Sequence, residues 1–491
     1  MADADHVSSS FLGRFLVLKG AARELWITFA VKFLGVAAYK LMNVTLVLWL
    51  SSDFGFSDQA ALRLVVAWSL SMTIVTLLVG SLTDAIGLRK TFFLGVWVCV
   101  IARAVMAFTT VKWLALACGL FPLAVGEALC TPVLVAAVRK YSNTQQRSIA
   151  FSLFYTIMNL GFLVAGYVFD FVRQGMGEYG ALDLPLIGTS VTTYRALFLV
   201  SLAIEITMLP VVYFIRKGAE VTDDGLRLLP EQVKYPDANL LNSFRLTVRD
   251  SVRDTIRLFG GLLQQPGFYR LLGFLMLIAF LKLIFMQIDY VFPKFGIREL
   301  GPGAPVGQLV ALNNWLIIFI VPFVGALTQR YPAYRMVIVG GIISAASVFF
   351  MALPTAWFET MARGAFGHWV GHGYLGLKGE VHPYYVMTTI FVIFLSVGEA
   401  FYSPRVYEYA AAIAPKGQEA SYSALSYIPF LLAKLLVGTV SGELLARYCP
   451  EQGERHSGTM WLIVALMATV APVGLITLRR FIRVHEVGRE E

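Results

Sequence analysis

The chain has 491 residues, of which 57% are hydrophobic and 14% are charged, and its formal net charge is +9. Soluble domains average about 45–50% apolar and about 25% charged residues, so this composition excludes a soluble globular protein and predicts one that crosses a bilayer many times. The basic residues are spread over many short loops, which argues against a nucleic-acid partner.

The N-terminal stretch MADADHVSSSFLGRFLVLKGAARELW mixes charged, polar and apolar side chains, and it shows no cleavable signal peptide. Apolar runs of about 20 residues, long enough to span a bilayer as helix, follow along the chain. They predict twelve transmembrane helices, at 26–50, 61–83, 91–110, 113–138, 149–172, 193–214, 269–292, 307–328, 334–353, 384–404, 421–445 and 459–479.

One long polar segment, 215–268, separates six predicted spans from six. We therefore expect an N-terminal six-helix bundle over 1–214, a cytoplasmic linker over 215–268 and a C-terminal six-helix bundle over 269–491. If both termini and the linker share one side, about 25 Lys and Arg residues fall on that side and about 9 on the other, which predicts that this side is cytoplasmic.

The linker contains the stretch TVRDSVRDTIRLF, in which apolar and basic residues each recur every four positions. This pattern predicts a short amphipathic helix on the inner membrane surface, with a regulatory docking site as the alternative. The residues that make the pattern are Val248, Val252, Ile256, Arg249, Arg253 and Arg257.

Two segments are repeated across the two halves. GEALCTP (126–132) and GEAFYSP (398–404) have an offset of 398 − 126 = 272, which also pairs Gly166 with Gly438. GSLTDAIGLRK (80–90) and GALTQRYPAYR (325–335) have an offset of 325 − 80 = 245. The difference between the offsets matches a long external loop near 354–382, which the first half lacks. Such repeats predict a duplicated bundle with a central site.

The segment GSLTDAIGLRK resembles the major facilitator superfamily loop between helices 2 and 3. The resemblance implies an all-α polytopic membrane protein with twelve transmembrane helices in two pseudo-symmetric six-helix bundles. It also implies a gating loop that latches the two halves in one state. The residues that carry it are Gly80, Asp84, Gly87, Arg89 and Lys90.

Three further segments resemble the proton-dependent oligopeptide transporter family: SLFYTIMNLG (152–161), ALNNWLIIFIVP (311–322) and SVGEAFYSPRVYEYAAAIAP (396–415). The chain lacks that family's Glu-x-x-Glu-Arg motif on helix 1, where it has Lys32 and Lys40. Thr131 stands where the family has a lysine before the helix 4 proline. These differences argue against di- and tripeptides as substrates.

Ionisable residues inside a membrane bundle are costly and usually face a partner or an aqueous cavity. In the superfamily helices 1, 4, 7 and 10 line the cavity, and most of this chain's intramembrane charges fall on those four. We expect Glu399 and Glu127 to bind and release the coupling proton. Each needs a cationic partner, for which Lys40 is the first candidate. Arg103 and Lys434 are interpreted as structural.

A cavity that contains Lys40 and Lys282 suits a substrate with a carboxylate or another anionic group. Polar side chains that could add hydrogen bonds to the substrate are Tyr39, Asn43, Asn159, Gln287, Asn313 and Tyr402. Three further residues are predicted to act in gating: Asp289 at the external end of helix 7, and Pro132 and Pro404, which can bend helices 4 and 10.

His368 and His372 have metal-like spacing and His382 is nearby, but no acidic or cysteine partner joins them, so no metal is expected. No catalytic or ATP-binding motif is present, so we expect no enzyme activity and no cofactor. The resulting hypothesis is a secondary transporter for a small polar or anionic solute. It would be a monomer in the lipid bilayer of the cell membrane, with both termini cytoplasmic and proton symport as its mechanism. A proton-driven antiporter and a non-transporting receptor or scaffold remain alternatives.

Overall fold

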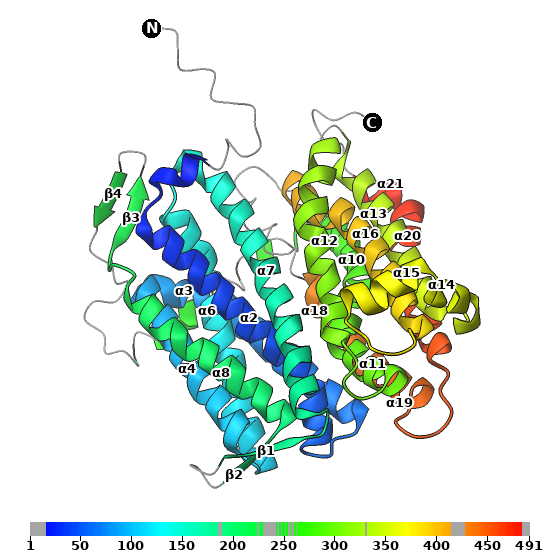
Figure 1. The fold of residues 1–491 in the computed structure, drawn as a ribbon. Coiled ribbons are helices and arrows are strands. Elements are labelled where there is room, and N and C mark those ends of the chain that lie inside the picture. Colours follow the sequence, from blue (N-terminus) through cyan, green and yellow to red (C-terminus); the bar gives the residue numbers. More distant parts are fainter. Residues whose placement is uncertain are drawn as a thin grey trace. The chain divides into compact units, whose positions relative to one another are not determined.

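The structure is a computed structural model, shown in Figure 1. It describes residues 16–184, 189–222, 225–228, 263–328, 331–413 and 428–483, together with scattered positions between 242 and 261. The described residues of this last stretch are helical, but Ile256 and several of its neighbours lie outside the described part. The predicted amphipathic helix of the linker therefore stays a prediction.

The described part of the first half of the chain is almost entirely helical, and it includes two short antiparallel hairpins, β1–β2 and β3–β4. In chain order its elements are η1 (Leu16–Gly20), α2 (Arg23–Ser52), α3 (Asp58–Ile86), α4 (Leu88–Phe108), α5 (Lys112–Leu114), η2 (Ala115–Leu120), α6 (Phe121–Lys140), α7 (Thr144–Met176), β1 (Ala181–Leu184), β2 (Thr189–Thr192), α8 (Thr193–Tyr213), β3 (Ala219–Thr222) and β4 (Gly225–Leu228).

The described part of the second half is helical and includes several short segments. Its elements are α10 (Pro266–Tyr290), α11 (Phe292–Leu300), α12 (Val306–Leu327), α13 (Ala333–Phe349), η3 (Phe350–Ala352), η4 (Thr355–Phe358), α14 (Glu359–Arg363), α15 (Ala365–His368), η5 (Trp369–Tyr374), α16 (Pro383–Ile413), α18 (Ile428–Leu436), η6 (Val437–Ser441), α19 (Gly442–Tyr448), α20 (Ser457–Thr477) and α21 (Arg479–Ile482).

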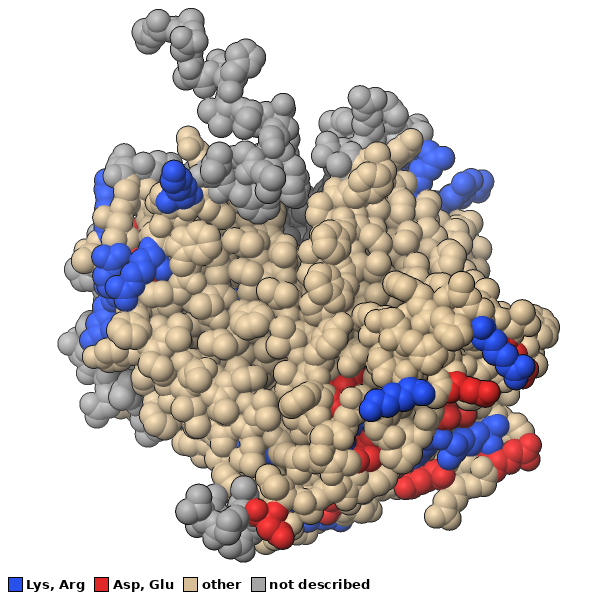
Figure 2. Space-filling view, viewed as in Figure 1, with Lys and Arg blue, Asp and Glu red and all other residues tan. Residues whose placement is uncertain are grey.

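Eleven helices of the described chain are long and apolar enough to cross a membrane, and each matches one of the predicted spans. The remaining predicted span, 421–445, is described only from Ile428, where α18, η6 and α19 continue as helix to Tyr448. The predicted external loop near 354–382 forms four short helical segments, η4, α14, α15 and η5. Apolar side chains of these segments, such as Phe358 and Val370, are buried. On the face shown in Figure 2, charged side chains gather toward the ends of the helices and leave broad uncharged surface between them, as expected for a multi-pass membrane protein.

The described residues form two compact units. Unit 1 comprises Met1–Met42, Ser71–Phe162 and Arg195–Thr255, and unit 2 comprises Asn43–Leu70, Leu163–Tyr194 and Ile256–Glu491. The ends of α2, α3 and α7 thus belong to unit 2. The predicted domain division at 214 and 269 stays a prediction.

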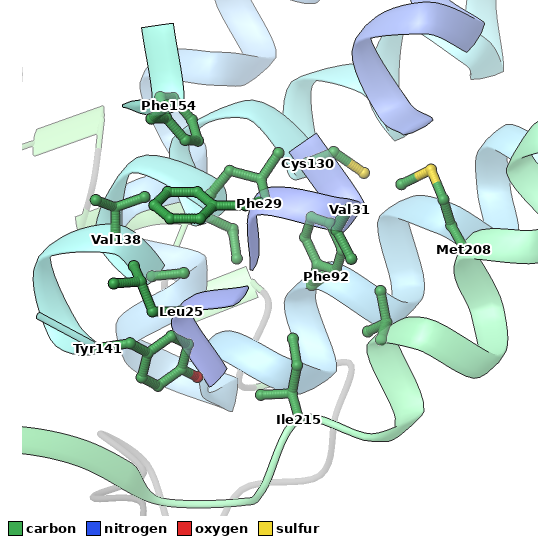
Figure 3. Close-up of a cluster of buried hydrophobic side chains, with 14 of the residues drawn as sticks. Leu25, Phe29, Val31, Phe92, Cys130, Val138, Tyr141, Phe154, Met208 and Ile215 are labelled. Atoms are coloured by element: carbon green, nitrogen blue, oxygen red, sulfur yellow. The ribbon is translucent and has the colours of Figure 1, made fainter. Parts of the chain in front are cut away.

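The core of unit 1 is formed by side chains from five helices. Figure 3 shows Phe29 of α2, Phe92 of α4, Val138 of α6, Phe154 of α7 and Met208 of α8 in one cluster, and all five are at most 8% exposed. Each helix presents apolar side chains on the face that packs against its neighbours. Burial of these side chains stabilises the bundle.

Close glycine contacts recur at the two offsets found in the sequence. In unit 1 a methyl group on Gly126 of α6 would come within 3.0 Å of the carbonyl oxygen of Gly95 on α4. In unit 2 a methyl group on Gly398 of α16 would come within 2.7 Å of the carbonyl oxygen of Gly340 on α13. The pairs are related by the same offsets, 398 − 126 = 272 and 340 − 95 = 245. Only glycine allows these backbones to approach so closely.

A second related pair lies within unit 2. A methyl group on Gly166 of α7 would meet the Cβ of Ala311 on α12 at 3.0 Å, and one on Gly438 of η6 would meet the Cβ of Val66 on α3 at 2.9 Å. The offsets are again 438 − 166 = 272 and 311 − 66 = 245. The duplication therefore extends from the sequence to individual helix contacts.

Candidate functional site

Glu399 lies in the middle of α16 and is part of a polar cluster in unit 2. The side-chain amide of Asn313, on α12, donates hydrogen bonds to Glu399 Oε2 at 3.1 Å and to Ser396 Oγ at 2.9 Å. Lys282, on α10, is the charged group that acts on Glu399. Three helices of unit 2 therefore bring a carboxylate, an amide and an ammonium group together inside the membrane-spanning region.

Lys282 is only 6% exposed, and aromatic rings surround its ammonium group. Nζ lies 5.1 Å from the ring centre of Tyr402 and 5.4 Å from that of Phe285, and it donates a hydrogen bond to Ser403 Oγ at 3.4 Å. Cation–π contacts of this kind compensate part of the lost hydration of a buried ammonium group. Tyr402, predicted to contact substrate, thus lies beside Lys282.

Glu127, on α6, has a different cationic partner from the one expected. Arg103 Nη2 of α4 lies 2.5 Å from Glu127 Oε1, and Lys32 of α2 also acts on this carboxylate. The close approach of α4 and α6 at Gly95 and Gly126 brings Arg103 within reach. The prediction of Lys40 as the partner of Glu127 is therefore wrong, and Arg103 is part of a charge cluster.

Sequence reasoning missed Glu205, although an acidic residue inside the predicted span 193–214 was itself a signal. Glu205 lies on α8, its side chain is 3% exposed, and its Oε2 is 3.2 Å from Arg103 Nη1. Arg103 Nε also donates a hydrogen bond to Ser201 Oγ at 2.7 Å, and Ser201 lies on α8 like Glu205. One guanidinium group therefore faces two carboxylates in unit 1.

Three other candidate substrate contacts, Lys40, Asn159 and Tyr39, lie in unit 1. The ammonium group of Lys40, which is half-buried, lies 5.3 Å from the ring centre of Phe162. Asn159 is 5% exposed and donates to the carbonyl of Tyr155 in its own helix at 2.9 Å. Tyr39 is half-buried on α2 next to Lys40.

Two predicted residues lie together near one end of α10. Asn43 Nδ2 donates to Asp289 Oδ2 at 3.4 Å, and the hydroxyl of Tyr290 donates to Asn43 Oδ1 at 3.2 Å. Asn43 therefore contacts the predicted gating residue Asp289, within unit 2. Gln287 donates instead to the hydroxyl of Ser441 on η6.

A charged network occupies the same end of unit 2. Asp58, at the start of α3, pairs with Lys294 of α11 and with Arg298, whose Nη1 lies 2.8 Å from Asp58 Oδ2. Burial lowers the pKa of Lys294, and the charge of Asp58 partly opposes this change. Sequence reasoning did not single out this network, because all three residues lie outside the predicted spans.

Asp170 of α7 caps the N-terminus of α12. Its two carboxylate oxygens accept hydrogen bonds from the backbone N–H groups of Gly307 at 3.1 Å and Gln308 at 2.6 Å. Arg173 lies between Asp170, at 3.0 Å, and Glu178. Burial raises the pKa of Glu178, but hydrogen bonding and charge from Arg173 outweigh it, so the pKa lies below its ordinary value. These contacts join α7 to α12 within unit 2.

The loop between α3 and α4 has the conformation that its glycine requires. Gly87 precedes α4 with φ of 88°, a value that strongly favours glycine. Arg89 Nη2 donates to the carbonyl of Tyr213 at the C-terminus of α8 at 2.7 Å, and Lys90 is exposed. Gly80 and Asp84 lie on helical backbone in α3, but the side chain of Asp84 is outside the described part.

Pro132 lies inside α6 and Pro404 inside α16, as predicted.

The rings of His368 and His372 are 4.9 Å apart, and His372 Nδ1 forms a hydrogen bond with the carbonyl of Leu377 at 2.7 Å. Within the described ranges there is no group of three or more His, Cys, Asp or Glu residues that could hold a metal ion.

The family model described as "Major Facilitator Superfamily" matches residues 28–371. No curated protein sequence matches. Solved structures of similar fold include a peptide transporter POT in complex with sulfate, with a TM-score of 0.66 and 16% identity over 94% of this chain and 96% of that chain.

Two further similar structures are POT family transporters. One, in complex with 5-aminolevulinic acid, has a TM-score of 0.67 and 14% identity over 94% of this chain and 97% of that chain. Another, in complex with a thioalcohol-conjugated peptide, has a TM-score of 0.68 and 14% identity over the same shares, 94% and 97%. At these identities the similarity establishes the fold.

Multiple spans, duplicated helix contacts and buried charges on several helices define a polytopic helical membrane transporter. The family match covers more than half of the sequence, and the chain belongs to the Major Facilitator Superfamily. Its fold is that of the POT family transporters, which confirms the resemblance found in the sequence.

Proposed function

We propose that this transporter carries a small polar or anionic organic solute by proton-coupled symport, with Glu399 as the coupling residue. The observation that carries the proposal is the cluster of Glu399, Asn313 and Lys282 on three helices of unit 2. A carboxylate and an ammonium group at such a depth are expensive to bury, and such residues in membrane proteins mark proton or substrate sites.

The chemistry of the cluster suggests how proton and substrate are linked. While Glu399 is ionised, Lys282 balances its charge. A proton on Glu399 neutralises the carboxylate, so Lys282 then needs another anion, and a carboxylate on the substrate would supply it. One proton and one anionic group would thus enter together with no uncompensated charge left in the low-dielectric interior.

A neighbouring structure supports the size and chemistry of this substrate class. It is a POT family transporter in complex with 5-aminolevulinic acid, a small molecule with a carboxyl group. The residues proposed to contact the solute are Lys40, Tyr39, Asn159, Lys282, Asn313 and Tyr402. We place Asn43 and Gln287 in gating instead, because Asn43 binds Asp289 and Gln287 binds Ser441.

The positive-inside distribution supports a cytoplasmic location for both termini, in a cell membrane, and we propose that the monomer is the working unit. Proton-driven efflux is the alternative mechanism, since the same carboxylate could exchange a proton for a solute. The buried charges disfavour a scaffold without transport, because a scaffold gains nothing from costly intramembrane ions.

The test is proton uptake into liposomes that contain the purified protein and a pH-sensitive dye. Peptides, amino acids, carboxylates and nucleosides are added outside in turn. We expect one carboxylate-bearing compound to acidify the lumen and Glu399→Gln to abolish the signal. Glu359→Gln, a matched change at an exposed position outside the spans, should keep it.

Two results would overturn the proposal. Acidification that Glu399→Gln leaves intact would remove that residue from coupling. Release of a preloaded compound driven by an inward proton gradient, with no uptake in the first format, would establish the antiporter alternative.

A further inference from the structure

We propose that Glu127, Arg103 and Glu205 form a second proton-binding site, in unit 1, at which two carboxylates share one proton. The proposal rests on proton-coupled transport as proposed above and adds a site on three other helices, α6, α4 and α8. It assigns a role to Glu205, which the sequence patterns did not single out.

The guanidinium group of Arg103 is at the centre of the site. Arg103 has 0% exposure. Its Nη2 donates a hydrogen bond to Glu127 at 2.5 Å and its Nε donates one to Ser201 at 2.7 Å, while Nη1 forms an ion pair with Glu205 at 3.2 Å without a hydrogen bond. The Ser201 hydroxyl donates onward to the carbonyl of Ala38 on α2 at 3.0 Å. One guanidinium group that is itself fixed in place therefore pairs with both carboxylates.

The charges of Arg103, Glu127 and Glu205 favour a state with one bound proton. An arginine keeps its proton in proteins, so a change in protonation here falls on the two glutamates. Two carboxylates close to one cation in a low-dielectric interior repel each other, and such a pair favours a state with one proton between them. One ionised carboxylate then neutralises Arg103, and the other is protonated.

Lys32 is the group that can change this balance. It is 7% exposed on α2, it acts on Glu127, and its ammonium group also lies 4.5 Å from the ring centre of Phe154 on α7. Among the residues that the structure describes, Cys99 of α4 and Cys130 of α6 are further titratable groups that interact with the two glutamates. If Lys32 moves toward Glu127, both carboxylates can be ionised and the shared proton leaves to water. If it moves away, one proton returns.

The site should therefore bind one proton independently of Glu399. Infrared difference spectroscopy of the purified protein tests this, because the C=O stretch of a protonated carboxyl group is visible directly. Spectra are recorded during a pH titration of the wild type, Glu127→Gln, Glu205→Gln and the double variant. Glu399→Gln and Thr207→Ala, a change at an exposed position of α8, are controls, and gel filtration checks that each protein is folded.

The wild-type spectrum also contains the titration of other carboxyl groups, Glu399 among them, so the measured quantity is the band that each variant removes from it. We expect either single variant to remove one carboxyl band, and the double variant to remove the same band and no more. Removal of one carboxylate leaves Arg103 to hold the other as an ion, so the two effects should not add. Glu399→Gln and Thr207→Ala should retain this band. Glu205→Asp, which keeps a carboxyl group, should retain a band that titrates.

A loss in the double variant equal to the sum of the two single losses would show two independent carboxyl groups and overturn the sharing. The absence of any difference between the wild type and both single variants would overturn the site itself. A failure of the proposed function is separately recognisable, because this band does not depend on substrate: uptake can be absent while the band is present.

Discussion

At the scale of single residues, Asn313 is placed to control Glu399. Its amide donates to both Ser396 and Glu399, which fixes the orientation of the amide and holds the carboxylate on one side of α16. A hydrogen bond to a charged group contributes about 1.5–3 kcal/mol, so its loss should be measurable.

We expect Asn313→Ala to raise the substrate concentration needed for half-maximal uptake by roughly tenfold or more, as about 1.4 kcal/mol corresponds to a factor of ten. Uptake by proteoliposomes over a range of substrate concentrations measures this. Thr360→Ala, a change at an exposed position in α14, serves as the control. An unchanged half-maximal concentration would exclude Asn313 from the site.

Residue types could be predicted from the sequence, but several of their partners could not. Intramembrane charge marked Glu127, Glu399 and Lys282 as unusual. The partner of Glu127 depends on how closely α4 and α6 approach, and that distance is set by Gly95 and Gly126, which lie on different helices. No local pattern reports it, so helix membership alone pointed to Lys40 rather than Arg103.

At the scale of helices, hydropathy located the spans because a bilayer crossing needs a continuous apolar run whatever its neighbours are. Contacts at helix ends were harder to foresee. Asp170 sits near the end of one predicted span, but its role depends on α12, whose first N–H groups lie 137 and 138 positions further along the chain. Carboxylates at helix N-termini are favourable because those N–H groups lack partners within the helix.

Asp170→Ala should therefore destabilise the protein by about 1–2 kcal/mol, the usual range for loss of a charged helix cap. We expect a lower apparent Tm in detergent. Asp183→Ala, at an exposed position in β1, is the control and should leave Tm unchanged. Equal values of Tm for the two variants would show that the cap contributes nothing.

At the scale of the molecule, the related contacts of Gly166 with Ala311 and of Gly438 with Val66 join α7 to α12 and η6 to α3 within unit 2. Alternating access requires that such contacts separate in one state and form in another. A side chain larger than hydrogen at either glycine would clash with the partner helix, and it should favour the separated state.

We expect Gly166→Val and Gly438→Val each to increase the rate at which a thiol reagent labels Ala304→Cys, in a protein whose native cysteines are replaced. Ala304 is only 5% exposed where α7 meets the start of α12. Gly175→Val is the matched control on α7, because a methyl group there meets nothing within 4 Å. Labelling that stays slow in both variants would mean that Ala304 becomes accessible without separation of these contacts.

The duplicated glycine contacts also allow a substitution in one half of the protein to be compared with the equivalent substitution in the other half. A substitution at Gly126 has an internal counterpart at Gly398, with the same backbone approach but different side chains nearby, Cys99 in one case and Ser344 in the other. Paired measurements at such positions separate what the helix geometry demands from what the local chemistry adds. The effect of a substitution in one half can then be compared with its effect in the other half of the same chain, without a second protein.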